Sequence, residues 1–239
     1  MTAFSYTIKP EIFSDHPDYI RGVVVFRGLD NAALHAEITQ ELRASEGALR
    51  ERIQGNPAEF PQIAAWRDAY RKFGAKPSEH RSSIEALSRR VLKPDSLPDI
   101  NALVDIGNLL SLRYVLPAGV HPISAGSHEI ELRKSKTSDT FLAEPDKDPE
   151  FIAPGEVVLA DGGRVLTRRW TWRQAADTRT LPETNCVFFD IDGLAPTSLA
   201  DVKSAIADLI QLVGEFCGGE CVGYAILDAK NPTMNVNLG

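Results

Sequence analysis

Residues 186–216 read CVFFDIDGLAPTSLADVKSAIADLIQLVGEF, and this stretch decides the fold. Its first part, CVFFDIDG, is a continuous apolar run of the kind that forms a buried strand. A helix begins near Ser198, and its apolar residues recur at steps of three and four: Leu199, Val202, Ile206, Leu209, Val213 and Phe216. Such a stripe buries one helix face, so we expect this helix and the strand to share a core.

Strand patterns recur before and after this unit. They lie at 18–27, which is rich in β-branched residues, at 128–134, which alternates, at 156–163 and 164–172, which form a hairpin turning at Asp161-Gly162-Gly163, and at 222–229. We expect the core to join strands near 19–27 and 185–191 to the last helix.

Helical patterns fill the first half of the chain. They cover 31–53 with Asp30 as the cap, 61–73 between Pro61 and Gly74, about 78–92, and about 100–114. Helices followed by strands predict an α+β fold with a mixed or antiparallel sheet. No long polar linker divides the chain, so we expect a single domain over residues 1–239.

Composition predicts a soluble, cytoplasmic protein. The 239 residues are 43% hydrophobic and 25% charged, with no apolar run of 18 residues and no signal-peptide pattern at the start. The three cysteines lack the partners of a zinc site, so we expect reduced thiols, no metal and no cofactor. Phosphate-loop, dinucleotide-binding, zinc-protease and serine-hydrolase motifs are absent from the sequence.

Charge is distributed unevenly. Residues 66–93 carry eight basic and three acidic side chains, a local charge of +5 against −7 for the chain, which leaves −12 elsewhere. The overall charge argues against a general nucleic-acid coat and against DNA binding. The basic strip is either a phosphate-facing surface or a pair of solvated helix faces. Its candidate RNA contacts are Arg67, Arg71, Lys72, Lys76 and Arg81.

Polar and aromatic residues suggest one pocket. The helix at 100–114 has Asn101, Asp105 and Asn108 on one side, and His121 follows in a loop framed by prolines and a glycine. Trp170 and Trp172 share a face if residues 164–172 stay extended, with arginines around them, a combination able to stack a base and hold phosphate. The alternative is that these tryptophans lie in the core. Asp190 and Asp192 are expected at a solvated strand end.

A family resemblance adds to these patterns. DINALVDIGNLLSLRYVLPAGVH resembles the segment of the B3/B4 editing domain of the phenylalanyl-tRNA synthetase β chain in which a V-D-x-x-N helix precedes a histidine. The matching positions are Val104, Asp105, Asn108 and His121. DYIRGVVVF and FCGGECVGYAI resemble the segments that open and close that domain, and WRDAYRKFGAKP, RSSIEAL, GEVVLADGG and RRWTWRQ resemble its free-standing bacterial forms.

The resemblance implies a pocket for the aminoacyl ester at the 3′ end of tRNA, and hydrolysis of that ester. It implies His121, Asn108 and Asp105 as catalytic residues, and five substrate-binding residues: Arg113, Tyr114, Trp170, Trp172 and Arg173. The partner would be tRNA, with no role for a membrane. Two departures stand out. Phe189 and Asp190 occupy the strand where the synthetase domain has a pocket glutamate, and its later threonine and alanine have no clear counterpart here.

Two other classes of function remain open. The chain is alternatively a non-catalytic RNA-binding or small-ligand-binding module that keeps the fold, which the two departures favour. A protein-interaction domain is the third possibility.

Overall fold

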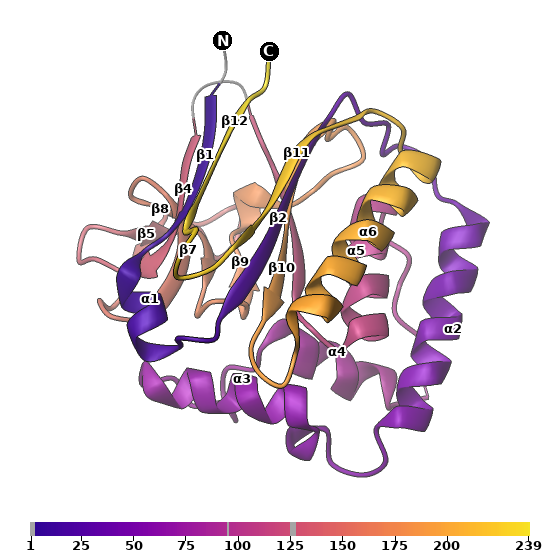
Figure 1. The fold of residues 1–239 in the computed structure, drawn as a ribbon, viewed down its shortest axis with the longest axis horizontal. Coiled ribbons are helices and arrows are strands. Elements are labelled where there is room, and N and C mark those ends of the chain that lie inside the picture. Colours follow the sequence, from indigo (N-terminus) through magenta and orange to yellow (C-terminus); the bar gives the residue numbers. More distant parts are fainter. Residues whose placement is uncertain (1–2, 95, 125–127) are drawn as a thin grey trace.

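The computed structural model describes residues 3–94, 96–124 and 128–239. Within them, two β-sheets face each other, and helices cover the far side of the smaller sheet (Figure 1). The larger sheet has eight strands in the order β12-β1-β4-β7-β8-β5-β6, with β9 paired on β8. Its strands are β1 (Ala3–Ile8), β4 (His128–Lys134), β5 (Thr140–Phe141), β6 (Glu150–Phe151), β7 (Val157–Asp161), β8 (Arg164–Arg168), β9 (Arg173–Gln174) and β12 (Thr233–Asn237).

The smaller sheet has four antiparallel strands in the order β11-β2-β10-β3. These are β2 (Ile20–Arg27), β3 (Ala118–Pro122), β10 (Cys186–Gly193) and β11 (Glu220–Leu227). Because side chains alternate along a strand, Phe188, Asp190 and Asp192 share one face of β10. Phe188 packs against Phe4 and Tyr6 of the larger sheet, with ring centroids 5.3 and 5.8 Å away. This face of β10 therefore points into the space between the sheets.

Six α-helices and two short 3-10 helices are described: α1 (Pro10–Asp15), α2 (Ala36–Arg52), η1 (Pro57–Glu59), α3 (Pro61–Lys72), α4 (Ser83–Val91), α5 (Ala102–Tyr114), η2 (Ala176–Thr178) and α6 (Leu199–Phe216). Figure 1 shows α6, α5 and α2 beside the smaller sheet, on the side away from the larger one. A Cβ at Gly22 would lie 2.7 Å from Ile206, so this glycine lets α6 approach β2 closely. Ser198 and Asp201 start α6 with a reciprocal capping box.

The α+β class is confirmed, as are the core of β2, β10 and α6 and the hairpin of β7 and β8. Two helix starts differ from prediction. The Asp30 carboxylate accepts from the Ala32 N–H, which holds a local turn, and α2 begins only at Ala36. Ser82 accepts from the Glu85 N–H and sets the start of α4 at Ser83, rather than near residue 78. Strands β1 and β12 were not predicted, because their pairing joins the two ends of the chain.

Two predictions about the candidate pocket's backbone are wrong. His121 does not lie in a loop: it lies in β3 and pairs opposite Phe188. The two tryptophans do not share a strand face, because β8 ends at Arg168 and the backbone turns with positive φ at Arg169 and Trp170. The turn directs Trp170 into the core against Tyr19 and Trp66, with ring centroids 4.9 and 5.2 Å away. Trp172 stays partly exposed.

Candidate functional site

A cavity of about 230 Å³ lies where β3 forms the edge of the smaller sheet. Its walls come from α5, from β3, from residues 167–174 and from the end of β10. The lining residues that matter below are Ser83, Asn108, Gly119, His121, Thr167, Trp170, Trp172, Arg173, Gln174, Asp190 and Asp192. The fold thus brings together five of the residues singled out from the sequence: Asn108, His121, Trp170, Trp172 and Arg173.

His121 is held in a fixed orientation. Its ring stacks on Phe188 with centroids 4.9 Å apart, and its Nδ1 lies 3.2 Å from the Gln174 amide nitrogen. That nitrogen also donates to the carbonyl oxygens of Val120, at 3.1 Å, and Thr178, which fixes it as a donor. Nδ1 therefore faces no acceptor, and a proton there would have no partner, so the ring proton sits on Nε2. Nε2 lies 3.6 Å from Asp190 Oδ2, inside the cavity wall.

Gly119 has to be a glycine for this arrangement. It pairs opposite Asp190 in the β3–β10 ladder. A Cβ at position 119 would lie 2.5 Å from Asp190 Oδ1 and 3.3 Å from His121 Nε2. Because glycine has no side chain, the Asp190 carboxylate and the His121 imidazole can both lie in the cavity wall at this point.

A buried ionic network lies under the cavity. Arg21, which is 1% exposed, binds Asp192 Oδ1 through Nε at 2.7 Å and Nη2 at 2.6 Å. Tyr19 also donates to Asp192, and Arg21 Nη1 donates to the Tyr6 hydroxyl. Asp190 is further from the guanidinium, with Oδ2 3.4 Å from Nη1.

The prediction that Asp190 and Asp192 are solvated is wrong, since they are only 5% and 1% exposed. Burial raises the pKa of Asp192 to about 6, and the nearby negative charge of Asp190 adds to this rise. Burial also acts to raise the pKa of Asp190, but the charge of Arg21 and hydrogen bonds from His121 and the Gly119 N–H outweigh it and hold this pKa at about 2. Asp190 is therefore ionised across the physiological range.

The rim of the cavity is basic and aromatic. Arg169 lies over the Trp172 ring with its guanidinium carbon 4.5 Å from the centroid, and His80 meets the same ring at 4.6 Å. Arg173 is exposed beside them. Ser83, the first residue of α4, also lines the cavity, so the loop that precedes α4 borders the rim.

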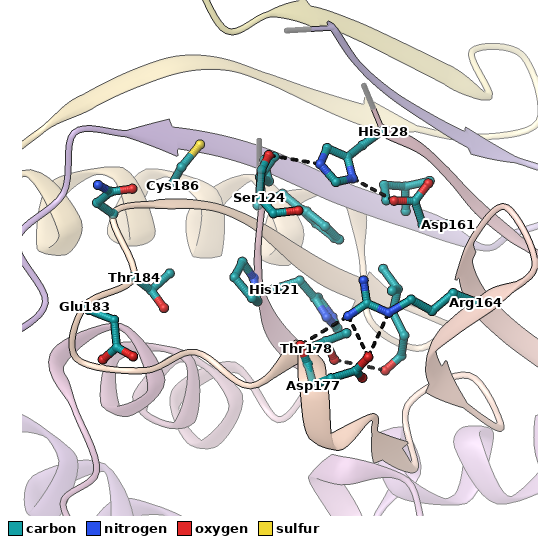
Figure 2. Close-up of a pocket in the computed structure, with 16 residues that line it drawn as sticks. His121, Ser124, His128, Asp161, Arg164, Asp177, Thr178, Glu183, Thr184 and Cys186 are labelled. Carbon is teal, nitrogen blue, oxygen red and sulfur yellow. Dashed lines mark hydrogen bonds and ion pairs between the residues drawn. The ribbon is translucent and has the colours of Figure 1, made fainter. Parts of the chain in front are cut away.

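A second cavity, of about 180 Å³, shares His121 (Figure 2). Figure 2 shows Arg164, Asp177 and Thr178 on one side and Glu183, Thr184 and Cys186 on another. Its charged groups largely pair with each other: Arg164 with Asp177 at 2.9 Å, and His128 Nδ1 with Asp161 at 2.6 Å. The cavity at the β3 edge is the better candidate site, because it brings together Asn108, His121, Trp170, Trp172 and Arg173.

Comparison with known proteins identifies the family. The sequence profile described as the B3/4 domain matches residues 65–218, more than half of the chain. The chain belongs to the B3/4 domain family. One similar solved structure is an N-terminal fragment of the phenylalanyl-tRNA synthetase β-subunit from Pyrococcus horikoshii, at 13% identity and a TM-score of 0.45. The alignment covers 93% of this chain and 50% of that one, so the chain spans about half the length of the fragment. No curated protein matches.

Three sequence-predicted residues of this B3/4 domain lie away from the cavity lining. Asp105 accepts the Ile100 N–H through both carboxylate oxygens, at 3.1 Å each, and so braces the start of α5. Arg113 and Tyr114 both bind Asp208 of α6 at 2.8 Å, and Arg113 also binds Glu41 of α2. These three residues tie helices together.

The polar side of α5 thus divides into separate tasks. Asn101 caps the helix by accepting the Val104 N–H, and its amide donates to Thr180 O at 3.0 Å. Asp105 accepts the Ile100 N–H at the start of the helix. Of these three residues, Asn108 alone lines the cavity. Thr167 and Gln174 also line the cavity and were not predicted, because no local pattern in the sequence distinguishes them.

The bracing role of Asp105 predicts a pH-dependent stability. Burial raises its pKa to about 6 from an ordinary 3.8, so its ionisation disfavours the folded state as pH rises through that window. The unfolding free energy of the wild type, measured relative to Asp105→Asn, should fall by roughly 2–3 kcal/mol between pH 4 and pH 7. Urea denaturation of both proteins across this range tests it, and a constant difference between them would contradict it.

The basic strip of the B3/4 domain is partly neutralised by its own acids. Arg67 binds buried Glu85 at 2.7 Å, and Arg89 binds the same carboxylate at 2.9 Å. Arg71 pairs with Asp68, Lys76 with Glu79 at 3.2 Å, and Lys72 donates to Asp15 O at 2.8 Å. The side chains of Arg71, Lys72, Lys76 and Arg81 nevertheless remain largely exposed, whereas Arg67 is 18% exposed.

Metal-binding clusters and membrane-spanning helices are both absent from the described residues. Across residues 3–94, 96–124 and 128–239, no group of three or more His, Cys, Asp or Glu could hold a metal ion. In the same part of the chain, no helix combines the length and apolar character needed to cross a membrane.

Proposed function

We propose that this B3/4 domain binds the 3′ end of tRNA and hydrolyses the ester of a mischarged aminoacyl-tRNA. The observation that carries the proposal is the cavity itself. It presents an oriented imidazole N–H and an amide, from His121 and Asn108, behind a basic, aromatic rim. An aminoacyl ester is already activated, so positioned donors rather than strong acid–base groups suffice for its hydrolysis.

The proposed reaction follows from these donors. A water oxygen attacks the ester carbonyl carbon, and His121 Nε2–H and the Asn108 amide donate to the oxygen that becomes negative. The bond from that carbon to the ribose oxygen then breaks, and the proton released by the water passes to the ribose oxygen. The products are the free amino acid and the uncharged tRNA.

The surroundings of the cavity support a nucleic-acid ligand. The loop that carries Lys76 and Arg81 reaches the rim at His80 and Ser83, and Trp172 supplies a stacking surface. The resemblance of Val104, Asp105, Asn108 and His121 to the synthetase editing segment supports the same ligand. A tRNA whose phosphate backbone binds along the strip would thus place its terminal nucleotide at the cavity.

Deacylation of charged tRNA tests the proposal. Purified protein is incubated with Tyr-tRNA(Phe) and with Phe-tRNA(Phe), and the released amino acid is followed with time. We expect release well above the buffer rate, and faster release from one of the two. If neither these nor other mischarged tRNAs are hydrolysed faster than in buffer, the hydrolase proposal fails.

A non-catalytic binding module is the second candidate. The observation that favours it is that the pocket glutamate of the synthetase domain has no direct counterpart, since Asp190 lies against Arg21 and His121. In that case the same protein would bind aminoacyl-tRNA without accelerating its hydrolysis, which a filter-binding assay run beside the deacylation assay detects.

The strip gives a separate prediction about tRNA affinity. Replacing Arg71, Lys72 and Lys76 by Glu should weaken tRNA binding by roughly 10-fold or more at low salt, because fewer counterions are released from the phosphates. The matched control replaces Lys147, Lys203 and Lys230 by Glu, which changes the net charge equally with exposed residues outside the strip. Equal affinities of the two triple variants, measured across a salt titration, would show that the strip is an ordinary solvated surface.

A further inference from the structure

The charges under the cavity do not balance. Two carboxylates, Asp190 and Asp192, share the single guanidinium of Arg21. The Nε and Nη2 groups of Arg21 are directed at Asp192, while its Nη1 donates to Tyr6. Asp190 thus makes the longer contact with the guanidinium, and it is buried where water solvates it poorly.

His121 does not supply the balancing charge. A protonated ring would carry N–H donors at both nitrogens, but Nδ1 faces the amide nitrogen of Gln174, itself a donor, at 3.2 Å. The geometry favours the neutral imidazole. One negative charge therefore remains on the pair of carboxylates in the cavity wall.

Thr167 adds an independent sign of a ligand at the same place. This residue lines the cavity and is only 8% exposed. Its Oγ1 has no hydrogen-bond partner among the residues that the structure describes. Buried hydroxyls in folded proteins are nearly always hydrogen-bonded, so an acceptor oxygen without a donor in this wall suits a ligand that brings its own N–H.

The sign of the charge reverses between rim and wall. Arg173 lines the mouth, and Arg168 and Arg169, both paired with Glu156, lie against Trp172, whereas Asp190 and Asp192 lie inside. This pattern fits a ligand that is anionic outside the cavity and cationic within it. An aminoacylated nucleotide has this polarity, because its phosphates precede the ribose and its ammonium group lies beyond the ester.

We propose that Asp190 and Thr167 form the subsite for the α-ammonium group of the bound aminoacyl ester. The proposal rests on the proposed function for the identity of the ester, and it adds that the site selects a free amino group whatever the side chain. A carboxylate and a hydroxyl oxygen both accept from an ammonium, and burial of Asp190 strengthens the ion pair.

Two amide probes that cannot be hydrolysed as esters test the subsite in the wild type. One is 3′-deoxy-3′-(L-tyrosylamino)adenosine, and the other carries 3-(4-hydroxyphenyl)propanoyl in place of tyrosyl, so that the two differ only in the α-ammonium group. We expect the ammonium probe to bind roughly 10- to 100-fold more tightly by calorimetry. Equal affinities, or no measurable binding of either probe, would overturn the proposal.

Variants assign the selectivity to residues. Asp190→Asn should remove the difference between the probes while leaving the propanoyl probe unchanged, and Thr167→Val should reduce the difference several-fold. Asp177→Asn, which alters a carboxylate paired with Arg164 in the neighbouring cavity, should keep the full difference. If Asp190→Asn folds and retains the preference, the subsite lies elsewhere. If it does not fold, the wild-type probe pair still decides.

The subsite and the hydrolase proposal can fail separately. Ammonium selectivity without deacylation of any tRNA would remove the hydrolase and keep the subsite. Deacylation with equal probe affinities would keep the hydrolase and remove the subsite.

Discussion

Replacing Arg21 by Met is expected to destabilise the protein by about 3–5 kcal/mol, because it leaves two buried carboxylates without their cation. Arg21 is the group that holds Asp192 at 2.6–2.7 Å and approaches Asp190 at 3.4 Å between the two sheets. Urea denaturation at pH 7 measures the loss, seen as a lower midpoint at an unchanged slope.

Two controls separate the charge from the side chain. Arg27→Met removes an arginine from the same strand whose pair with Glu220 is exposed, and should cost less than about 1 kcal/mol. Adding Asp192→Asn to Arg21→Met should restore part of the loss, since one uncompensated charge is removed with its partner. If Arg21→Met were as mild as Arg27→Met, the network would not stabilise the space between the sheets.

The second large effect concerns catalysis. His121→Ala and Asn108→Ala should each lower kcat/KM for deacylation by roughly 10²–10³-fold, which is the typical effect of removing one donor to a developing oxyanion. Trp172→Ala removes a stacking surface at the rim instead, so we expect it mainly to raise KM. Single-turnover deacylation and circular dichroism on each variant measure activity and fold together.

His128→Ala is the matched control for that series. His128 lines the neighbouring cavity, where it pairs with Asp161, and does not line the cavity at the β3 edge, so its loss should leave deacylation near the wild-type rate. Folded His121→Ala and Asn108→Ala proteins with wild-type activity would place the reaction outside the cavity at the β3 edge.

The elements predicted well are those whose signals are local. The stripe from Leu199 to Phe216 lies within one helix, and the turn at Gly162-Gly163 lies within one hairpin, so neighbouring residues carry the whole pattern. Strand β3 was missed, because AGVHP is short and bears no alternation. It is extended because it pairs with β10, about seventy residues further along the chain.

The sequence by itself determined the α+β class, the α6–β10 unit and the choice of Asn108, His121 and Trp172 as candidate site residues. Periodicity, turn residues and the order of motifs can all be recognised from residues that are close in sequence. The tertiary structure alone decided what those groups do. Asp190 and Asp192 changed from an expected solvated strand end to a buried wall because Arg21, 171 residues from Asp192, folds against them. Gln174, 53 residues from His121, determines which imidazole nitrogen carries the proton. A side chain's charge and tautomer depend on partners that meet it only after folding, and no local pattern records which partners those are.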